Sequence, residues 1–149
     1  MAKSYTLISA PAVTNLASLA SGAYWVSPNV DNNSALAHVI EMLLSILTTT
    51  TLGTDGGVDV YIAGSLDGTT YAGGITIESD ATYTPTGDDV SHWDLIGSLK
   101  YTAETTARTL EKRLALFDIP KNFKYVVYNR TGEVFGATVA LTHNAIKQG

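Results

Sequence analysis

Apolar and polar residues alternate at a period of two along much of the chain. Late in the sequence, Phe123, Tyr125 and Val127 fall on one face of an extended segment, and Lys124 and Tyr128 fall on the other. Similar alternation, or an apolar run beside a turn signal, predicts further strands at residues 4–10, 23–27, 58–62, 71–77, 93–101 and 134–141.

Two apolar segments fit both helical and extended spacing. Residues 34–51 fit a helix with Ser34 as its N-cap, but alternate residues are also apolar, and the run ends in four threonines that favour a strand. In residues 107–117, the spacing of Leu110, Leu114 and Phe117 fits one face of a helix. In a strand, Leu110, Leu114 and Leu116 would share one face with Lys112. We interpret both segments as strands.

Turn signals separate the predicted strands. Asp67 and Gly68 predict a hairpin tip between residues 58–62 and 71–77, because Asp-Gly tolerates the positive φ of a two-residue turn. Pro120 marks the turn before the strand at Phe123, and the turn from Asn129 to Gly132 predicts a second hairpin. The polar residues 79–91 predict a surface loop.

About eight strands without a βαβ rhythm indicate an all-β protein, an antiparallel β-sandwich or barrel. Residues 21–149 are the expected sandwich domain. Residues 1–20 have little apolar pattern, and we expect an extended N-terminal arm that contacts another chain, with Lys3, Tyr5 and Leu7 as candidate contacts.

Composition narrows the possible partners. The 149 residues suit one domain, and only 15% of them are charged, which suggests a surface covered by partners. A net charge of −5 argues against nucleic acid, and the start of the chain does not read as a signal peptide. The run Val39–Leu47 is too short to span a membrane, and the absence of cysteine excludes disulfides.

Charge is unevenly distributed along the chain. Residues 51–99 contain eight acids and no Lys or Arg, whereas residues 100–130 contain seven basic residues and three acids. Turn-rich loops that use Asp would explain this, and so would complementary patches between copies in an assembly. On the second interpretation, the candidate interface residues are Arg108, Lys112, Arg113 and Lys121.

No group of residues has the spacing of a catalytic, metal or cofactor site. The segment Ser91–Asp94 contains the residue types of a catalytic triad, but neighbouring strand residues point to opposite faces. Acid pairs such as Asp88 and Asp89 lack the ordered spacing of a calcium loop. We therefore expect no enzymatic activity and no cofactor. The eight tyrosines could stack on sugars, pack in a protein interface or belong to the core.

Two segments resemble small structural proteins of tailed bacteriophages. They are Val58–Tyr71 (VDVYIAGSLDGTTY) and Ile119–Gly132 (IPKNFKYVVYNRTG), each a strand followed by a turn. Several such proteins are capsid decoration, or cement, proteins with a jelly-roll-like fold, often trimeric on the shell. The resemblance implies a virion protein made in the bacterial host cytoplasm, with the major capsid protein or another virion protein as its partner and a homotrimer as its own assembly.

Other functions remain open from the sequence. A neck, tail or fibre-attachment protein of the virion is the nearest alternative to a decoration protein. A carbohydrate-binding β-sandwich module would show exposed aromatic residues along one face.

Overall fold

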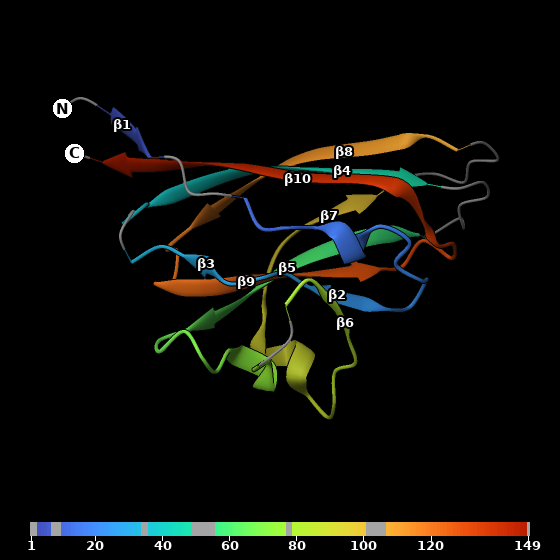
Figure 1. The fold of residues 1–149 in the computed structure, drawn as a ribbon, viewed down its shortest axis with the longest axis horizontal. Coiled ribbons are helices and arrows are strands. Elements are labelled where there is room, and N and C mark those ends of the chain that lie inside the picture. The colour runs from blue at the N-terminus through green and yellow to red at the C-terminus, as the bar shows by residue number, and fades with distance from the viewer. Residues whose placement is uncertain are drawn as a thin grey trace.

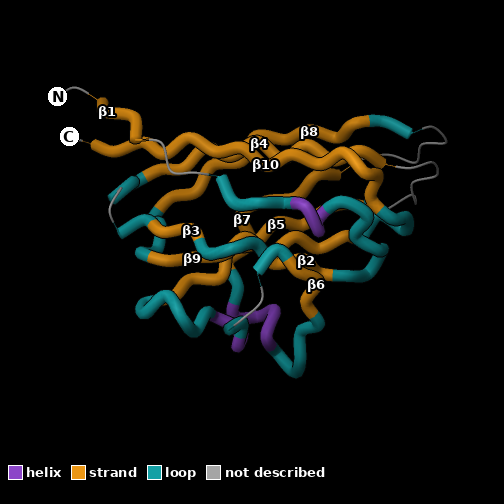
Figure 2. Tube along the Cα trace, in the orientation of Figure 1, coloured by secondary structure: helices purple, strands orange, loops and turns teal. Residues whose placement is uncertain are grey.

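The protein is all-β, as predicted. The computed structural model describes residues 3–6, 10–33, 36–48, 56–76, 79–100 and 107–148. In this part of the chain, ten strands form two antiparallel sheets, and the only helices are three short 3-10 turns (Figures 1 and 2). The two sheets pack face to face around one apolar core, so the fold is a β-sandwich.

The upper sheet in Figure 1 has four strands in the order β1-β10-β4-β8. Its strands are β1 (Lys3–Thr6), β4 (Val39–Thr48), β8 (Thr109–Phe117) and β10 (Phe135–Gln148).

The lower sheet has six strands, with the order β6-β2-β9-β5-β7 and with β3 paired to β9 beyond the end of β2. Its strands are β2 (Tyr24–Val26), β3 (Val30–Asp31), β5 (Gly57–Ser65), β6 (Ala81–Tyr83), β7 (Asp94–Lys100) and β9 (Asn122–Asn129). With the short β3 and β6 set aside, the orders β1-β10-β4-β8 and β2-β9-β5-β7 are those of a jelly roll.

Every ladder among the described strands joins strands that are not consecutive in the chain. This corrects both predicted hairpins. The turn from Asn129 to Gly132 leads from β9 in one sheet to β10 in the other, and β5 pairs with β7 and β9. A turn signal shows where the chain reverses, but it does not select the strand that receives the hydrogen bonds. Residues 71–76, the described part of the strand expected at 71–77, contain no strand, and a 3-10 turn, η2 (Ala72–Gly74), lies there.

The strand interpretation of residues 34–51 and 107–117 is correct for β4 and β8. The side chains of Ile40, Met42, Leu44 and Ile46 in β4 are buried between the sheets. In β8, the buried side chains are Leu110, Leu114 and Leu116. Lys112 shares their face but lies at the edge of the sandwich, where its Nζ donates to the Ser98 carbonyl of β7 (2.7 Å).

The described part of residues 1–20 belongs to the sandwich. The β1 strand pairs with the end of β10 in the same chain, from Lys3 opposite Gln148 to Thr6 opposite Ala145. After β1, the 3-10 turn η1 (Thr14–Leu16) places Leu16 in the core, and Leu19 is buried beside it. The expected division at residue 20 is therefore not a boundary of the core.

A second, smaller core lies on the outer face of the six-stranded sheet. Residues 66–76 and 84–93, called the covering segment below, lie under this sheet in Figure 2 and include η2 and a third 3-10 turn, η3 (Asp89–His92). Its side chains Tyr71, Ile75 and Trp93 are buried against the sheet residues Val26, Ala63 and Val126. Because both faces of β9 are covered, most of its side chains are buried, including that of Lys124.

A β-bulge in β7 interrupts the alternation expected there. Val60 of β5 is opposite Gly97, but the next residue, Tyr61, is opposite Leu95, so Ile96 is the extra residue. Leu95 therefore lies on the outer face and is 58% exposed, although the alternation predicted it on the same face as Leu99.

Candidate functional site

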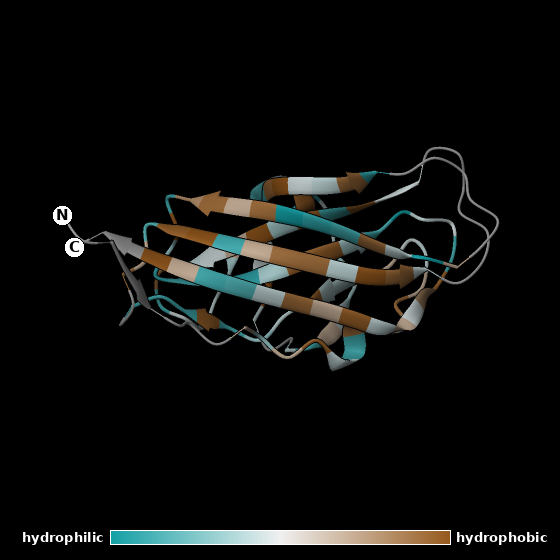
Figure 3. Ribbon diagram, turned by 90° about the horizontal axis from the view of Figure 1, so that it is seen from above, coloured by the Kyte–Doolittle hydropathy of each residue, from teal (hydrophilic) through white to brown (hydrophobic). Residues whose placement is uncertain are grey.

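The outer face of the four-stranded sheet carries an apolar row across its strands. Phe117 of β8 is opposite Val39 of β4, Val39 is opposite Ile146 of β10, and Ile146 is opposite Tyr5 of β1. Directly opposed residues lie on the same face of a sheet, so these four positions form one line. The Phe117 side chain is 67% exposed, and Figure 3 shows apolar bands at this end of the sheet, beside the termini.

The whole outer face of this sheet is called the four-stranded face below. Outside the apolar row, most of its residues are small or uncharged. Leu43 is exposed at its centre, and its neighbours across the strands are Arg113 and Thr142. Together with Glu41 and Asn144, these residues line a depression of about 280 Å³. This face therefore combines exposed apolar side chains with few charges, and no described segment of the chain lies over it.

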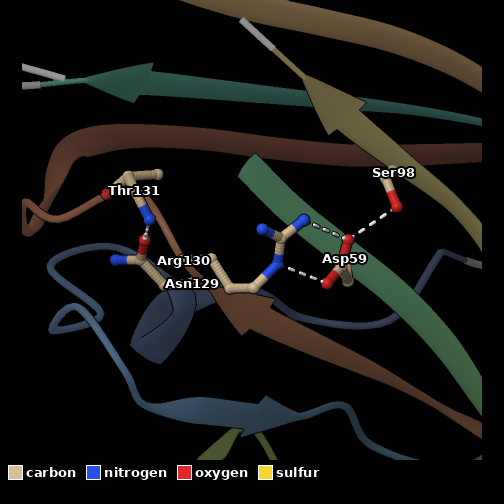
Figure 4. A network of polar contacts seen from close by, with 5 residues as sticks. All are labelled: Asp59, Ser98, Asn129, Arg130 and Thr131. Atoms are coloured by element: carbon tan, nitrogen blue, oxygen red, sulfur yellow. Dashed lines mark hydrogen bonds and ion pairs between the residues drawn. The ribbon is translucent and has the colours of Figure 1, made fainter. Parts of the chain in front are cut away.

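The outer face of the six-stranded sheet holds a partly buried ion pair. Asp59 of β5 accepts two hydrogen bonds from the guanidinium of Arg130, from Nε to Oδ2 (2.6 Å) and from Nη2 to Oδ1 (3.0 Å), and a third from Ser98 Oγ (2.6 Å; Figure 4). Burial by itself would raise the pKa of Asp59. The hydrogen bonds from Arg130 and Ser98 and the positive charge of Arg130 outweigh burial, so the pKa is lowered and the carboxylate is ionised.

Three tyrosine rings surround this ion pair. The rings of Tyr24 and Tyr128 are stacked, with centroids 4.2 Å apart and planes at 9°. Trp93, at the end of the covering segment, makes edge contacts with Tyr24 (5.7 Å) and Tyr61 (5.9 Å). All three tyrosines are half-buried, so each has one part packed and one part open to solvent.

The hydroxyl groups of these tyrosines make no hydrogen bond within the part of the chain that the structure describes. Burial raises the pKa of Tyr24 and of Tyr61, and the charge of Asp59 adds to both effects. The hydroxyls of Tyr24 and Tyr61 are therefore neutral, and a tyrosine hydroxyl can both donate and accept hydrogen bonds. We call the set of Tyr24, Asp59, Tyr61, Ser98, Tyr128 and Arg130 the tyrosine face.

The four basic residues proposed from the sequence do not form one patch. Arg108 precedes β8 and Lys121 follows it, so they lie at opposite ends of that strand. Lys112 and Arg113 are adjacent on β8 and point to opposite faces. Of the four, Arg113 lies on the four-stranded face. Of the arm residues, Lys3 and Tyr5 lie in β1, and Leu7 is outside the described residues.

Several acids of the acidic stretch are bonded within the chain. Asp59 binds Arg130, and Asp80 accepts from Trp25 Nε1 (2.9 Å) and from the Asn15 amide (3.0 Å). Asp89 accepts from the Thr86 amide (2.6 Å). These bonds stabilise the fold and its loops, which favours the loop interpretation of the uneven charge.

The turn residues predicted from the sequence have local structural roles. Asp67 accepts from the amides of Thr69 and Thr70 (2.8 and 2.9 Å), which lowers its pKa, and Gly68 has a φ of 76°. Asn129 Nδ2 donates to the carbonyls of Leu19 and Glu133, both at 2.8 Å. Gly132 has a φ of 84°, and Pro120 lies against Gly64 of β5.

Sequence reasoning did not find the tyrosine face. Its members come from β2, β5, β7 and β9 and from the residue after β9, and the ion pair joins residues 71 positions apart. The available signal was an Asp on the polar face of an alternating strand and the abundance of tyrosine. Neither feature identifies partners without the order of the strands.

No model of a known protein family matches the chain, and no curated protein matches it. In the described residues, no three His, Cys, Asp or Glu side chains lie close enough together to hold a metal ion. No helix in the same part of the chain is long and apolar enough to cross a membrane.

Proposed function

We propose that this chain is a non-enzymatic structural protein of a virion, a capsid decoration protein that binds the shell through its four-stranded face. The observation that carries the proposal is the apolar row of Phe117, Val39 and Ile146 across that face, in which Phe117 is exposed and the other two residues are half-buried. The jelly-roll strand order, the low charge content and the resemblance of residues 58–71 and 119–132 to phage structural proteins support it.

The physical basis is burial of apolar surface on a flat face. Burying one large apolar side chain is worth about 1.5–3 kcal/mol, and Phe117 offers most of its ring to a partner. Among the side chains that the structure describes on this face, the charged ones are those of Arg113, Glu41 and Glu111, and both signs of charge are present, so a partner can pair with them when the face docks. A protein that binds the assembled shell and not its free subunits stabilises the shell by mass action.

The N-terminal strand extends this face toward neighbouring chains. The β1 strand forms one edge of the four-stranded sheet, and Tyr5 continues the apolar row by its position opposite Ile146. We propose that Lys3 and Tyr5 contribute to contacts with the capsid or with other copies. A homotrimer would place three such faces around one symmetry axis of the shell.

The test uses particles assembled without this protein. Capsids from a phage whose copy of this gene is deleted are mixed with the purified chain and sedimented, and we expect the chain to sediment with them. Phe117→Glu should weaken binding at least tenfold, because it places a charge in the apolar row. Leu66→Glu is the matched control, since Leu66 is 94% exposed on a loop of the other sheet and should have no effect.

Cryo-electron microscopy of the same particles shows whether the chain binds the capsid shell or the neck, tail or fibres. Density for the chain on the capsid lattice supports a decoration protein. Density only at the neck, tail or fibres supports the alternative virion role, and a chain that is absent from purified virions contradicts both.

A further inference from the structure

We propose that the tyrosine face is a binding site for a neutral saccharide. This site lies on the outer face of the six-stranded sheet, so it is separate from the four-stranded face and does not depend on the proposed capsid contact. Three observations support the ligand class: the fixed aromatic rings, the free hydroxyls and the balanced charge.

The rings are held in place before any ligand binds. Tyr128 is stacked on Tyr24, and Trp93 packs against the edges of Tyr24 and Tyr61. Trp93 is itself fixed by a hydrogen bond from its Nε1 to the Ala72 carbonyl (2.9 Å). Ligand binding therefore orders few side chains, and little conformational entropy is lost.

The polar groups suit a ligand that has many hydroxyls and no charge. The three tyrosine hydroxyls can donate to and accept from sugar hydroxyls, and the half-buried rings can pack against the C–H groups of a sugar. Asp59 and Arg130 neutralise each other through two hydrogen bonds, so the pair itself has no net charge, and Lys100 at the end of β7 is a further positive charge that acts on Asp59.

The size of the site favours a small ligand over a protein. Its strands β2, β9, β5 and β7 are neighbours in the sheet, so the site spans about 14 Å at the usual spacing between strands. The covering segment ends against it at Trp93. A protein interface of ordinary size would need about 800 Å² on each partner, and the polar and aromatic groups of this site occupy a much smaller area.

The experiment begins with the full-length chain on a microarray of neutral and acidic microbial glycans. The glycan with the strongest signal is then titrated by calorimetry. We expect a neutral glycan to bind, and Tyr61→Phe and Tyr128→Phe should each raise the Kd about fivefold to tenfold, because each removes one hydrogen-bonding hydroxyl and keeps the ring. Circular dichroism and the melting temperature confirm that these variants are folded.

Phe117→Ala is the control, because it removes an exposed aromatic ring from the opposite sheet and should leave glycan binding unchanged. No signal on the array, binding to acidic glycans alone, or a Kd that the tyrosine variants do not change would overturn the proposal. Tyrosine variants that lose capsid sedimentation and show no effect on glycans would assign this face to a protein partner.

Discussion

At the scale of single residues, Asp59 and Arg130 show how a buried charge is tolerated. The Asp59 side chain is 12% exposed and receives three hydrogen bonds, so its desolvation is offset by close contacts. Its removal leaves the guanidinium of Arg130 without this carboxylate.

The first prediction concerns the Asp59 carboxylate. Asp59→Asn should lower the free energy of unfolding by about 1–3 kcal/mol, because the charge-assisted hydrogen bonds between Asp59 and Arg130 are lost. Urea denaturation at pH 7 measures the change. Asp88→Asn is the control, because the Asp88 side chain is 85% exposed, and it should leave stability unchanged.

The same carboxylate predicts the pH dependence of stability. The pKa of Asp59 is lower in the folded protein than in the unfolded chain, so its contribution is fully present above the unfolded pKa of about 3.9. As the pH falls through the folded pKa, this contribution is lost. The stability gap between the wild type and Asp59→Asn should therefore narrow when denaturation is repeated near pH 3. A stability gap of the same size at pH 7 and pH 3 would contradict a lowered pKa for Asp59 in the folded protein.

The third prediction compares two adjacent glycines in the covering segment. Gly73 and Gly74 both have positive φ, 73° and 72°, but a Cβ on Gly73 would collide with Trp93 and the Asp89 carbonyl, whereas a Cβ on Gly74 would meet no atom within 4 Å. Gly74→Ala should cost only the backbone penalty of about 1–2 kcal/mol. Gly73→Ala should cost clearly more and reduce the near-ultraviolet circular dichroism of Trp93. Equal melting temperatures would show that Trp93 is not packed on Gly73.

At the scale of elements, the segment around η1 is the least expected part of the fold. Its sequence has weak apolar pattern, yet Leu16 and Leu19 enter the core between the sheets. The Phe135 amide also donates to the Leu19 carbonyl (3.0 Å), which ties this segment to the start of β10.

The fourth prediction tests whether this segment is part of the folded domain. Leu16→Ala should destabilise the protein by about 2–5 kcal/mol, as large-to-small changes in a core do. Leu66→Ala, at a leucine that is 94% exposed, should change the stability by less than about 0.5 kcal/mol. Thermal denaturation of both variants makes the comparison, and similar melting temperatures would mean that residues 10–20 are dispensable to the core.

At the scale of the whole molecule, the jelly roll contains no ladder between consecutive strands in its described residues. The two edges of β4, for example, pair with β8 and β10, which follow it in the chain only after the whole of β5 and β7. Loops must therefore close over long stretches of chain before their contacts stabilise the fold.

The fifth prediction follows from that topology. Refolding should be slow for a chain of this size, with the main phase in milliseconds to seconds, because non-local pairing dominates. Stopped-flow fluorescence of Trp25 and Trp93 after dilution from urea measures the rate, since both side chains are buried in the folded state. A main phase faster than about 0.1 ms would contradict the non-local order of strand pairing.

The sequence by itself determined that the chain forms strands and which side chains of most strands face the core. Alternation in β9 and β4 correctly placed Tyr125 and Leu44 inward, because burial on one face of a sheet imposes a period of two on the strand itself. Positive φ at Gly68 and Gly132 could also be predicted, since turn conformation depends on neighbouring residues.

Only the tertiary structure decided which strands pair, where the β-bulge in β7 reverses the alternation of inward and outward side chains, and which residues come into contact. Asp59 and Arg130, Tyr24 and Tyr128, and the row from Phe117 to Ile146 each join residues far apart in the chain. Local sequence cannot specify such contacts, because strand order is set by how two sheets bury their apolar faces together. Both proposed binding faces arise from that packing, so neither could be predicted from a single segment.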